Sequence, residues 1–87
     1  MKVKEGFILR DMGGQPIVVS VGAASKTLNG MIKLNDSGKF LWEKLQKDVT
    51  EEELAEALVE KYEISKETAS ADVKAFVETL KKPGIIE

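Results

Sequence analysis

The stretch MIKLNDSGKFLW, residues 31–42, joins a short apolar strand to the start of a helix. We predict that Asn35 or Asp36 caps this helix, because a side-chain oxygen at the cap accepts hydrogen bonds from the free amide groups of the first turn. Five of the seven glycines precede this point, among β-branched runs, and charged stretches with helical spacing follow it. The chain is therefore predicted to place strands first and helices second. The expected buried face of the helix has the spacing i, i+3, i+4 and i+7: Gly38, Leu41, Trp42 and Leu45.

Two apolar runs on the N-terminal side, residues 7–12 and 17–21, predict a β-hairpin. The connection Gly13-Gly14-Gln15-Pro16 contains glycines that supply positive φ and a proline that marks the start of a strand. Residues 22–30 are predicted to be a loop, and residues 31–34 a third short strand. Three strands make a small sheet when helices cover one of its faces.

Two more helices are expected after the first. Thr50 and Glu53 form a capping box at the start of the second helix, because they stand three residues apart and can satisfy each other's backbone amides. Ser65 caps the third helix, and Pro83-Gly84 ends it. We expect the apolar tail, residues 85–86, to fold back onto the core. The predicted stripes are Leu54, Leu58 and Tyr62 on the second helix and Ala69, Val73, Phe76, Val77 and Leu80 on the third.

The composition excludes several classes of protein. The chain has 87 residues, which suits one domain over residues 1–87, and it has no cysteine and no histidine. Disulfide frameworks, zinc fingers, thiolate nucleophiles and histidine-based active sites are therefore ruled out. Its 13 basic and 15 acidic residues nearly cancel, which argues against a nucleic-acid partner. No apolar run approaches the ~20 residues that span a bilayer, so we expect a cytoplasmic protein without a membrane partner.

No motif indicates catalysis, a metal or a cofactor. The glutamates of residues 51–63 lie outside the apolar stripe of their helix, as solvated residues do. The chain contains no calcium-binding loop pattern, and Gly13-Gly14 precedes a strand, whereas phosphate-binding glycines precede a helix. We therefore predict a protein that is not an enzyme and holds neither metal nor cofactor. Trp42 is assigned to the core, since it shares the stripe of Leu41 and Leu45.

The third strand lies beside amphipathic helices in this prediction. If one edge of the sheet is open, its unpaired amide and carbonyl groups can accept an incoming peptide strand, and the groove between strand and helix can select side chains. Such a device requires neither histidine nor metal. An unassigned interaction domain remains the alternative at this point.

Several motifs together resemble the PqqD-like family of pyrroloquinoline quinone biosynthesis. The family has a Leu-Asn-x-Ser/Thr-Gly start, an aliphatic-Trp pair, a threonine-capped acidic helix that ends near a tyrosine, an Asp-Val-x-x-Phe stretch and a Gly-aliphatic-Ile-Glu end. The first strand is also similar, so the resemblance covers nearly the whole chain. The matching positions here are residues 34–38, Leu41-Trp42, residues 50–62, Asp72-Val73 with Phe76, and residues 84–87.

The resemblance implies a winged-helix-like domain that recognises ribosomally made, modified peptides. Members bind the leader of a precursor peptide and present it to a modifying enzyme, often a radical S-adenosylmethionine enzyme. The leader adds to the third strand and packs against the third helix. Carried to this chain, the backbone of Met31, Ile32, Lys33 and Leu34 pairs with the leader, and Asp72 and Phe76 line the groove.

Three questions stay open in the sequence. A winged-helix DNA-binding domain is the alternative function, with residues 65–82 as its reading helix. The product is either the quinone or another peptide, because Gly22 to Leu28 lacks the aspartate-rich turn of many relatives. A homodimer is also allowed, since an exposed edge strand can pair with a second copy of itself.

Overall fold

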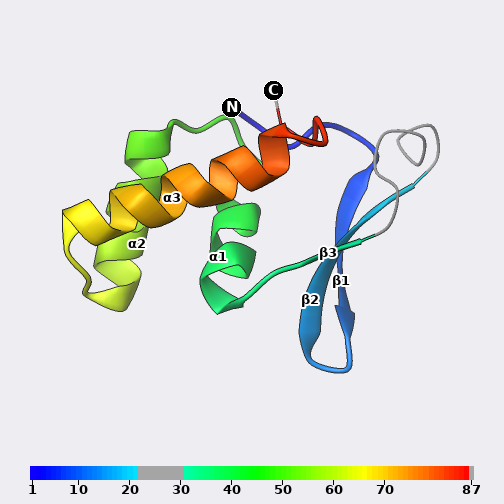
Figure 1. The fold of residues 1–87 in the computed structure, drawn as a ribbon, viewed down its shortest axis with the longest axis horizontal. Helices are drawn as coiled ribbons and strands as arrows, with labels where there is room; N and C mark the ends of the chain where they lie inside the picture. Colours follow the sequence, from blue (N-terminus) through cyan, green and yellow to red (C-terminus); the bar gives the residue numbers. More distant parts are fainter. Residues whose placement is uncertain (22–30, 87) are drawn as a thin grey trace.

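The structure of the protein is a computed structural model, which describes residues 1–21 and 31–86 (Figure 1). The predicted loop at residues 22–30 lies outside this described part. The element order confirms the expected α+β, winged-helix-like class, with a three-stranded antiparallel sheet followed by three helices. The elements are β1 (Phe7–Met12), β2 (Gln15–Ser20), β3 (Met31–Lys33), α1 (Asp36–Lys44), α2 (Glu51–Tyr62) and α3 (Lys66–Lys81).

A tight turn of two glycines closes the hairpin of β1 and β2. Gly13 and Gly14 have φ values of 65° and 87°. Positive φ at both central residues is typical of a type I′ turn, whose twist matches that of the flanking strands. The second strand begins at Gln15, two residues before the predicted Ile17, so Pro16 belongs to the strand. Proline is tolerated near a strand start, where a missing backbone donor disrupts the ladder least.

The helix starts follow the predicted capping chemistry. The Asn35 side chain accepts a hydrogen bond from the Gly38 amide at 2.7 Å, which makes Asn35 the cap of α1. Thr50 heads α2 with both bonds of a capping box. Ser65 caps α3 by accepting a hydrogen bond from the Thr68 amide at 3.1 Å. Local spacing therefore located all three helix starts.

The prediction that Tyr62 belongs to the core is wrong. Its side chain is 38% exposed and packs edge-on against Phe40, with 6.1 Å between the ring centroids. Tyr62 is the last residue of α2, and the chain leaves the helix at Glu63 in a left-handed conformation. The apolar periodicity of the sequence continues to the end of α2. The buried core does not extend as far, so the final turn of the helix is exposed.

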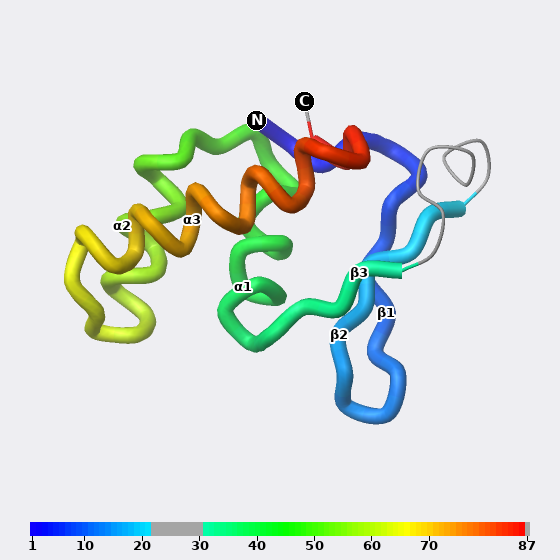
Figure 2. Tube along the Cα trace, viewed as in Figure 1, coloured from blue at the N-terminus to red at the C-terminus, as the bar shows by residue number. Residues whose placement is uncertain are grey.

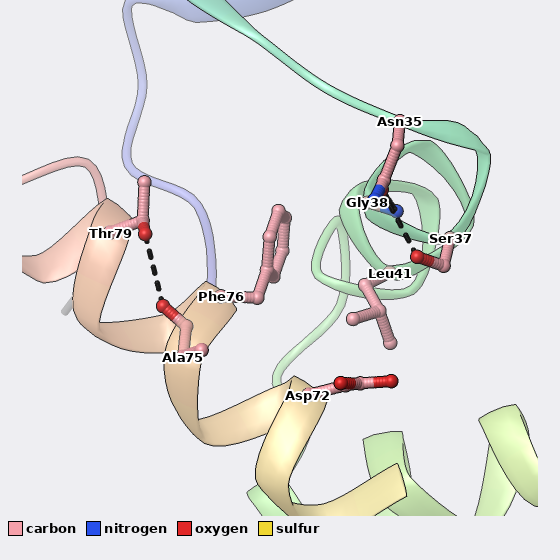
Figure 3. A pocket seen from close by; sticks show the side chains of 8 residues that line it. All are labelled: Asn35, Ser37, Gly38, Leu41, Asp72, Ala75, Phe76 and Thr79. Carbon is pink, nitrogen blue, oxygen red and sulfur yellow. Dashed lines mark hydrogen bonds between the residues drawn. The ribbon is translucent and has the colours of Figure 1, made fainter. Parts of the chain in front are cut away.

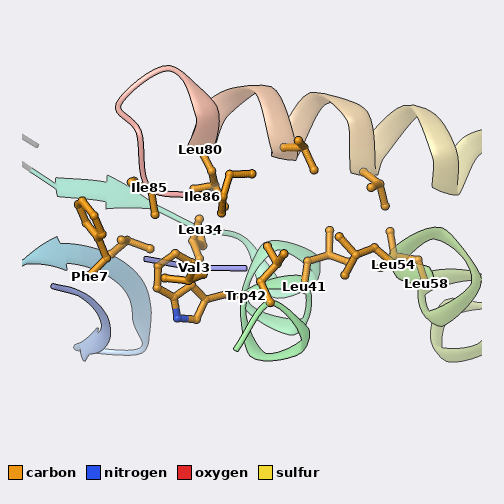
Figure 4. Close-up of a cluster of buried hydrophobic side chains, with 14 of the residues drawn as sticks. Val3, Phe7, Leu34, Leu41, Trp42, Leu54, Leu58, Leu80, Ile85 and Ile86 are labelled. Atoms are coloured by element: carbon orange, nitrogen blue, oxygen red, sulfur yellow. The ribbon is translucent and has the colours of Figure 1, made fainter. Parts of the chain in front are cut away.

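The core joins the sheet to all three helices (Figure 4). Trp42 is 3% exposed, which confirms its assignment to the core. The tail also folds back as predicted, because Ile85 and Ile86 are buried and Ile86 bridges to Val3. The N-terminal and C-terminal segments therefore run side by side (Figure 2). No helix of the described chain has both the length and the apolar character to cross a membrane.

Candidate functional site

The third strand, β3, lies at an edge of the sheet in the order β1-β2-β3. The Leu34 amide donates to the Pro16 carbonyl at 2.9 Å, so the backbone groups of Leu34 point toward β2. Backbone groups alternate in direction along an antiparallel strand. Those of Ile32 therefore also point toward β2, and those of Met31 and Lys33 point away from it, to the edge where the described chain places no further strand.

A side chain completes the pairing at the end of β3. Pro16 has no N–H and cannot return a hydrogen bond to the Leu34 carbonyl. The Gln15 amide Nε2 donates to that carbonyl at 2.7 Å and to the Pro16 carbonyl at 3.0 Å. This arrangement holds Leu34 against β2 although proline interrupts the ladder. It also fixes the direction in which the chain leaves the sheet for α1.

A cleft of about 290 Å³ opens between the start of α1 and one face of α3 (Figure 3). Phe76 extends from α3 toward α1 and is partly buried against the core. Gly38 lies in close contact with its surroundings: a Cβ atom there would stand 3.1 Å from Asn35 Oδ1, 3.3 Å from Leu34 Cβ and 3.4 Å from Phe76 Cε1. Glycine on the buried face of α1 was predicted to admit another element, and that element is α3.

A second cleft, of about 440 Å³, lies between β3 and α3. It shares four lining residues with the first, so the two form one groove that runs from the strand edge along α3. We call this continuous surface the strand–helix groove. Its shared residues are Asn35, Gly38, Phe76 and Thr79.

Most of the residues predicted for peptide binding lie on this groove. Asp72 and Phe76 line its α3 side. Ile32, Lys33 and Leu34 line the end beside β3. Met31 is 54% exposed and is part of the same strand. The structure therefore brings Ile32, Lys33, Leu34, Asp72 and Phe76 to one surface, and Met31 lines neither cleft.

Seven residues that line the groove were not among those predicted to bind the peptide: Gln15, Asn35, Ser37, Gly38, Leu41, Ala75 and Thr79. Ala75 and Thr79 are one helical turn or less from the predicted residues of α3, so the spacing 72, 75, 76 and 79 was an available signal. The Thr79 hydroxyl donates to the Ala75 carbonyl at 3.0 Å (Figure 3). Gln15 offered no comparable signal, because its role depends on a contact with Leu34, nineteen positions away.

The groove has chemistry suited to binding. Its walls combine Leu41 and the Phe76 ring with the side chains of Asn35, Ser37 and Asp72. Asp72 is exposed, so its carboxylate can accept hydrogen bonds from a bound partner. Within residues 1–21 and 31–86, no cluster of three or more acidic side chains is placed to hold a metal ion. Apolar contacts, side-chain hydrogen bonds and backbone pairing are what this surface offers.

Comparisons with known proteins identify a family, and solved structures share the fold. The family model for coenzyme PQQ synthesis protein D (PqqD) matches residues 9–86. No curated protein matches the chain. Two solved structures share the fold. TbiB1 in complex with the TbiA(beta) leader peptide has a TM-score of 0.78 and 17% identity, over 100% of this chain and 95% of that chain. Lasso peptide synthetase B1 complexed with the leader peptide has a TM-score of 0.74 and 19% identity, over 97% of this chain and 93% of that chain.

Proposed function

The chain belongs to the PqqD family, and from that premise we propose that it is a non-catalytic adaptor that binds the leader of a ribosomally made precursor peptide. Residues 1–87 act as a single recognition domain in this proposal. The observation that carries it is the edge of β3, which no other strand of residues 1–21 and 31–86 covers, beside the strand–helix groove. Both solved relatives are complexes with leader peptides, which supports the same role here.

The leader binds as a fourth strand in this proposal. Strand addition supplies affinity through main-chain hydrogen bonds, and alternate side chains of the peptide supply specificity. Of residues 31–34, only Met31 and Lys33 direct their backbone N–H and C=O groups to the open edge. We therefore expect the leader to pair with these two residues and not with all four. Leader side chains on the inner side would then enter the groove against Phe76 and Asp72.

The adaptor presents the bound leader to a modifying enzyme, which we propose is a radical S-adenosylmethionine enzyme of the cytoplasm. The family match supports the pathway of pyrroloquinoline quinone or of a related peptide product. Neither reaction nor cofactor is assigned to the chain itself. Its contribution is to raise the effective concentration of the precursor at the enzyme.

The test is a titration of the ¹⁵N-labelled protein with the leader of a candidate precursor peptide. We expect the largest amide shifts at residues 31–34 and along α3. Phe76→Ala should weaken leader binding by at least tenfold, since aromatic residues in a partly desolvated site carry much of the binding energy. Its stability loss should stay below the ~3–5 kcal/mol typical of a fully buried phenylalanine, because Phe76 is only partly buried.

A matched control separates binding from stability. Phe40 is also partly buried against the core, yet it lies among Lys44, Lys61 and Tyr62 on the α1–α2 side. Phe40→Ala should lower stability and leave leader affinity unchanged. Leader binding that shifts neither β3 nor α3 would contradict the assigned groove. Tight, steeply salt-dependent binding to duplex DNA in place of the leader would favour the alternative winged-helix function.

A further inference from the structure

The sheet is apolar on both of its faces. Side chains alternate between the two faces along a strand. Phe7, Leu9, Val18 and Ile32 contact the core, so the residues between them face the opposite way. We call that opposite side the outer face. It consists of Ile8, Arg10, Met12, Gln15, Ile17, Val19, Met31 and Lys33.

The outer face departs from the usual alternation, in which the solvated side of an antiparallel sheet is polar. Ile8, Val19 and Met31 are cross-strand partners and form an apolar row over all three strands. Ile8 is 36% exposed, Met31 54% and, near the hairpin turn, Met12 56%. Ile17 is only 4% exposed although it is not part of the core cluster. This face is therefore an exposed apolar patch, of the kind that marks interaction sites.

The charges of the outer face have a single sign. Arg10 and Lys33 flank Ile17 in the next cross-strand row, and both are positive. Their alkyl stems can cover Ile17 while the charged ends stay in water. Asp11 alternates to the other face, and its carboxylate accepts a hydrogen bond from the Gly14 amide at 2.7 Å. A positive face on a chain of net charge −2 favours a partner with carboxylates.

A second copy of the chain fits this face poorly. Two outer faces in contact would bring together four cations and no carboxylate. The area is also small: three strands ~4.8 Å apart and about five residues long, at ~3.3 Å per residue, cover roughly 250 Å² of plane. Even counted on both partners, this stays far below the ~1,200 Å² of a stable dimer and in the range of transient contacts.

We propose that the outer face is a docking site for the modifying enzyme, through an apolar surface patch on that enzyme rimmed by aspartate or glutamate. The identity of the partner rests on the proposed function, whereas its chemistry rests on the outer face alone. The leader and the enzyme occupy different surfaces that meet at Lys33, since one pairs with the edge of β3 and the other covers the outer side chains of the sheet.

The experiment compares two double variants that each remove one exposed apolar group and one positive charge. Ile8→Thr/Arg10→Gln alters the outer face on β1, the strand farthest from the leader edge. Lys44→Gln/Tyr62→Gln is the control, since Tyr62 is 38% exposed and lies on α2. Both are titrated with the leader peptide and with a radical S-adenosylmethionine enzyme that modifies its precursor.

We expect the outer-face variant to bind the enzyme at least tenfold more weakly than the wild type and the leader with unchanged affinity. The control variant should match the wild type for both partners. Enzyme binding should also weaken with added salt, because exposed charges are screened. Met12→Gln gives a second, milder outer-face variant at a side chain that is 56% exposed, in case the double variant is unstable.

Several results would overturn the proposal: no enzyme binding by the wild type, equal enzyme binding by the outer-face variants, or an equal loss in the control. A wild-type dimer that becomes monomeric on Ile8→Thr/Arg10→Gln, with enzyme binding unchanged, would assign the face to a second copy. Failure of the wild type to bind the leader would instead remove the proposed function, and the enzyme affinities would still decide the docking site.

Discussion

Proline substitution at β3 separates the two roles of its backbone. Lys33→Pro deletes an N–H that points to the open edge, whereas Ile32→Pro deletes one that points to β2. Proline is tolerated in an edge strand when its missing donor faces solvent. Lys33→Pro should therefore leave the sheet intact and remove one hydrogen bond from the incoming leader. Ile32→Pro should break the ladder between β2 and β3.

The expected magnitudes follow from one hydrogen bond each. A hydrogen bond contributes ~0.5–1.5 kcal/mol, and an acceptor left without a partner costs ~1–3 kcal/mol. In Lys33→Pro, the acceptor left without a donor is a leader carbonyl that is partly open to water. We therefore expect the binding free energy to weaken by about 1–2 kcal/mol, or roughly 5- to 30-fold in Kd. For Ile32→Pro the acceptor is the carbonyl of Val18, whose side chain is fully buried, so the loss appears as stability.

The assay pairs urea denaturation with calorimetric titration of the leader peptide. Lys33→Ala is the control, because it removes the same side chain and keeps the N–H. Lys33→Pro should unfold close to the wild-type midpoint and bind weakly, and Lys33→Ala should bind almost as the wild type does. Equal affinities for Lys33→Pro and Lys33→Ala would refute strand addition at β3, and a large loss of stability in Lys33→Pro would refute the deduced direction of its N–H.

Three further predictions concern stability. Gln15→Ala should lower the free energy of unfolding by ~1–3 kcal/mol, measured by urea denaturation, because the Leu34 carbonyl loses its donor; Gln15→Glu, which cannot donate, should do the same. Thr50→Ala should cost ~1 kcal/mol through loss of the helix cap, read from the thermal midpoint. The Met1 ammonium, 2.6 Å from Asp48, lowers the pKa of Asp48. This contribution should be present above pH 4 and be lost as pH falls through the lowered pKa; Asp48→Asn should flatten that part of the stability–pH profile.

The helix starts were predictable because their causes are local. A cap and its amide partners stand within three residues of each other, so Thr50, Ser65 and Asn35 carry the whole signal. The end of a buried stripe is not local, because it depends on where the covering helix stops. That is why periodicity placed Tyr62 in the core although the structure exposes it.

Individual residues of the groove could be predicted from the sequence, but the contacts between them could not. Gly38 indicated a close approach of some element, but the sequence did not show that the element is Phe76, 38 positions away. The direction of each β3 amide follows from one bond, Leu34 to Pro16, that exists only after the strands pair. The sequence does contain a signal for the outer face. Ile17-Val18-Val19 is a continuous apolar run, which is typical of strands covered on both faces.

The geometry of a strand explains how β3 can serve both proposed partners at once. Backbone groups lie in the plane of the sheet, and side chains stand perpendicular to it. Met31 and Lys33 direct their N–H and C=O groups to the open edge and their side chains to the outer face. A leader strand would therefore use their backbone without covering their side chains, and would extend the sheet beside the docked enzyme. The two contacts then meet along one strand of three residues, which places the leader next to the enzyme that must receive it.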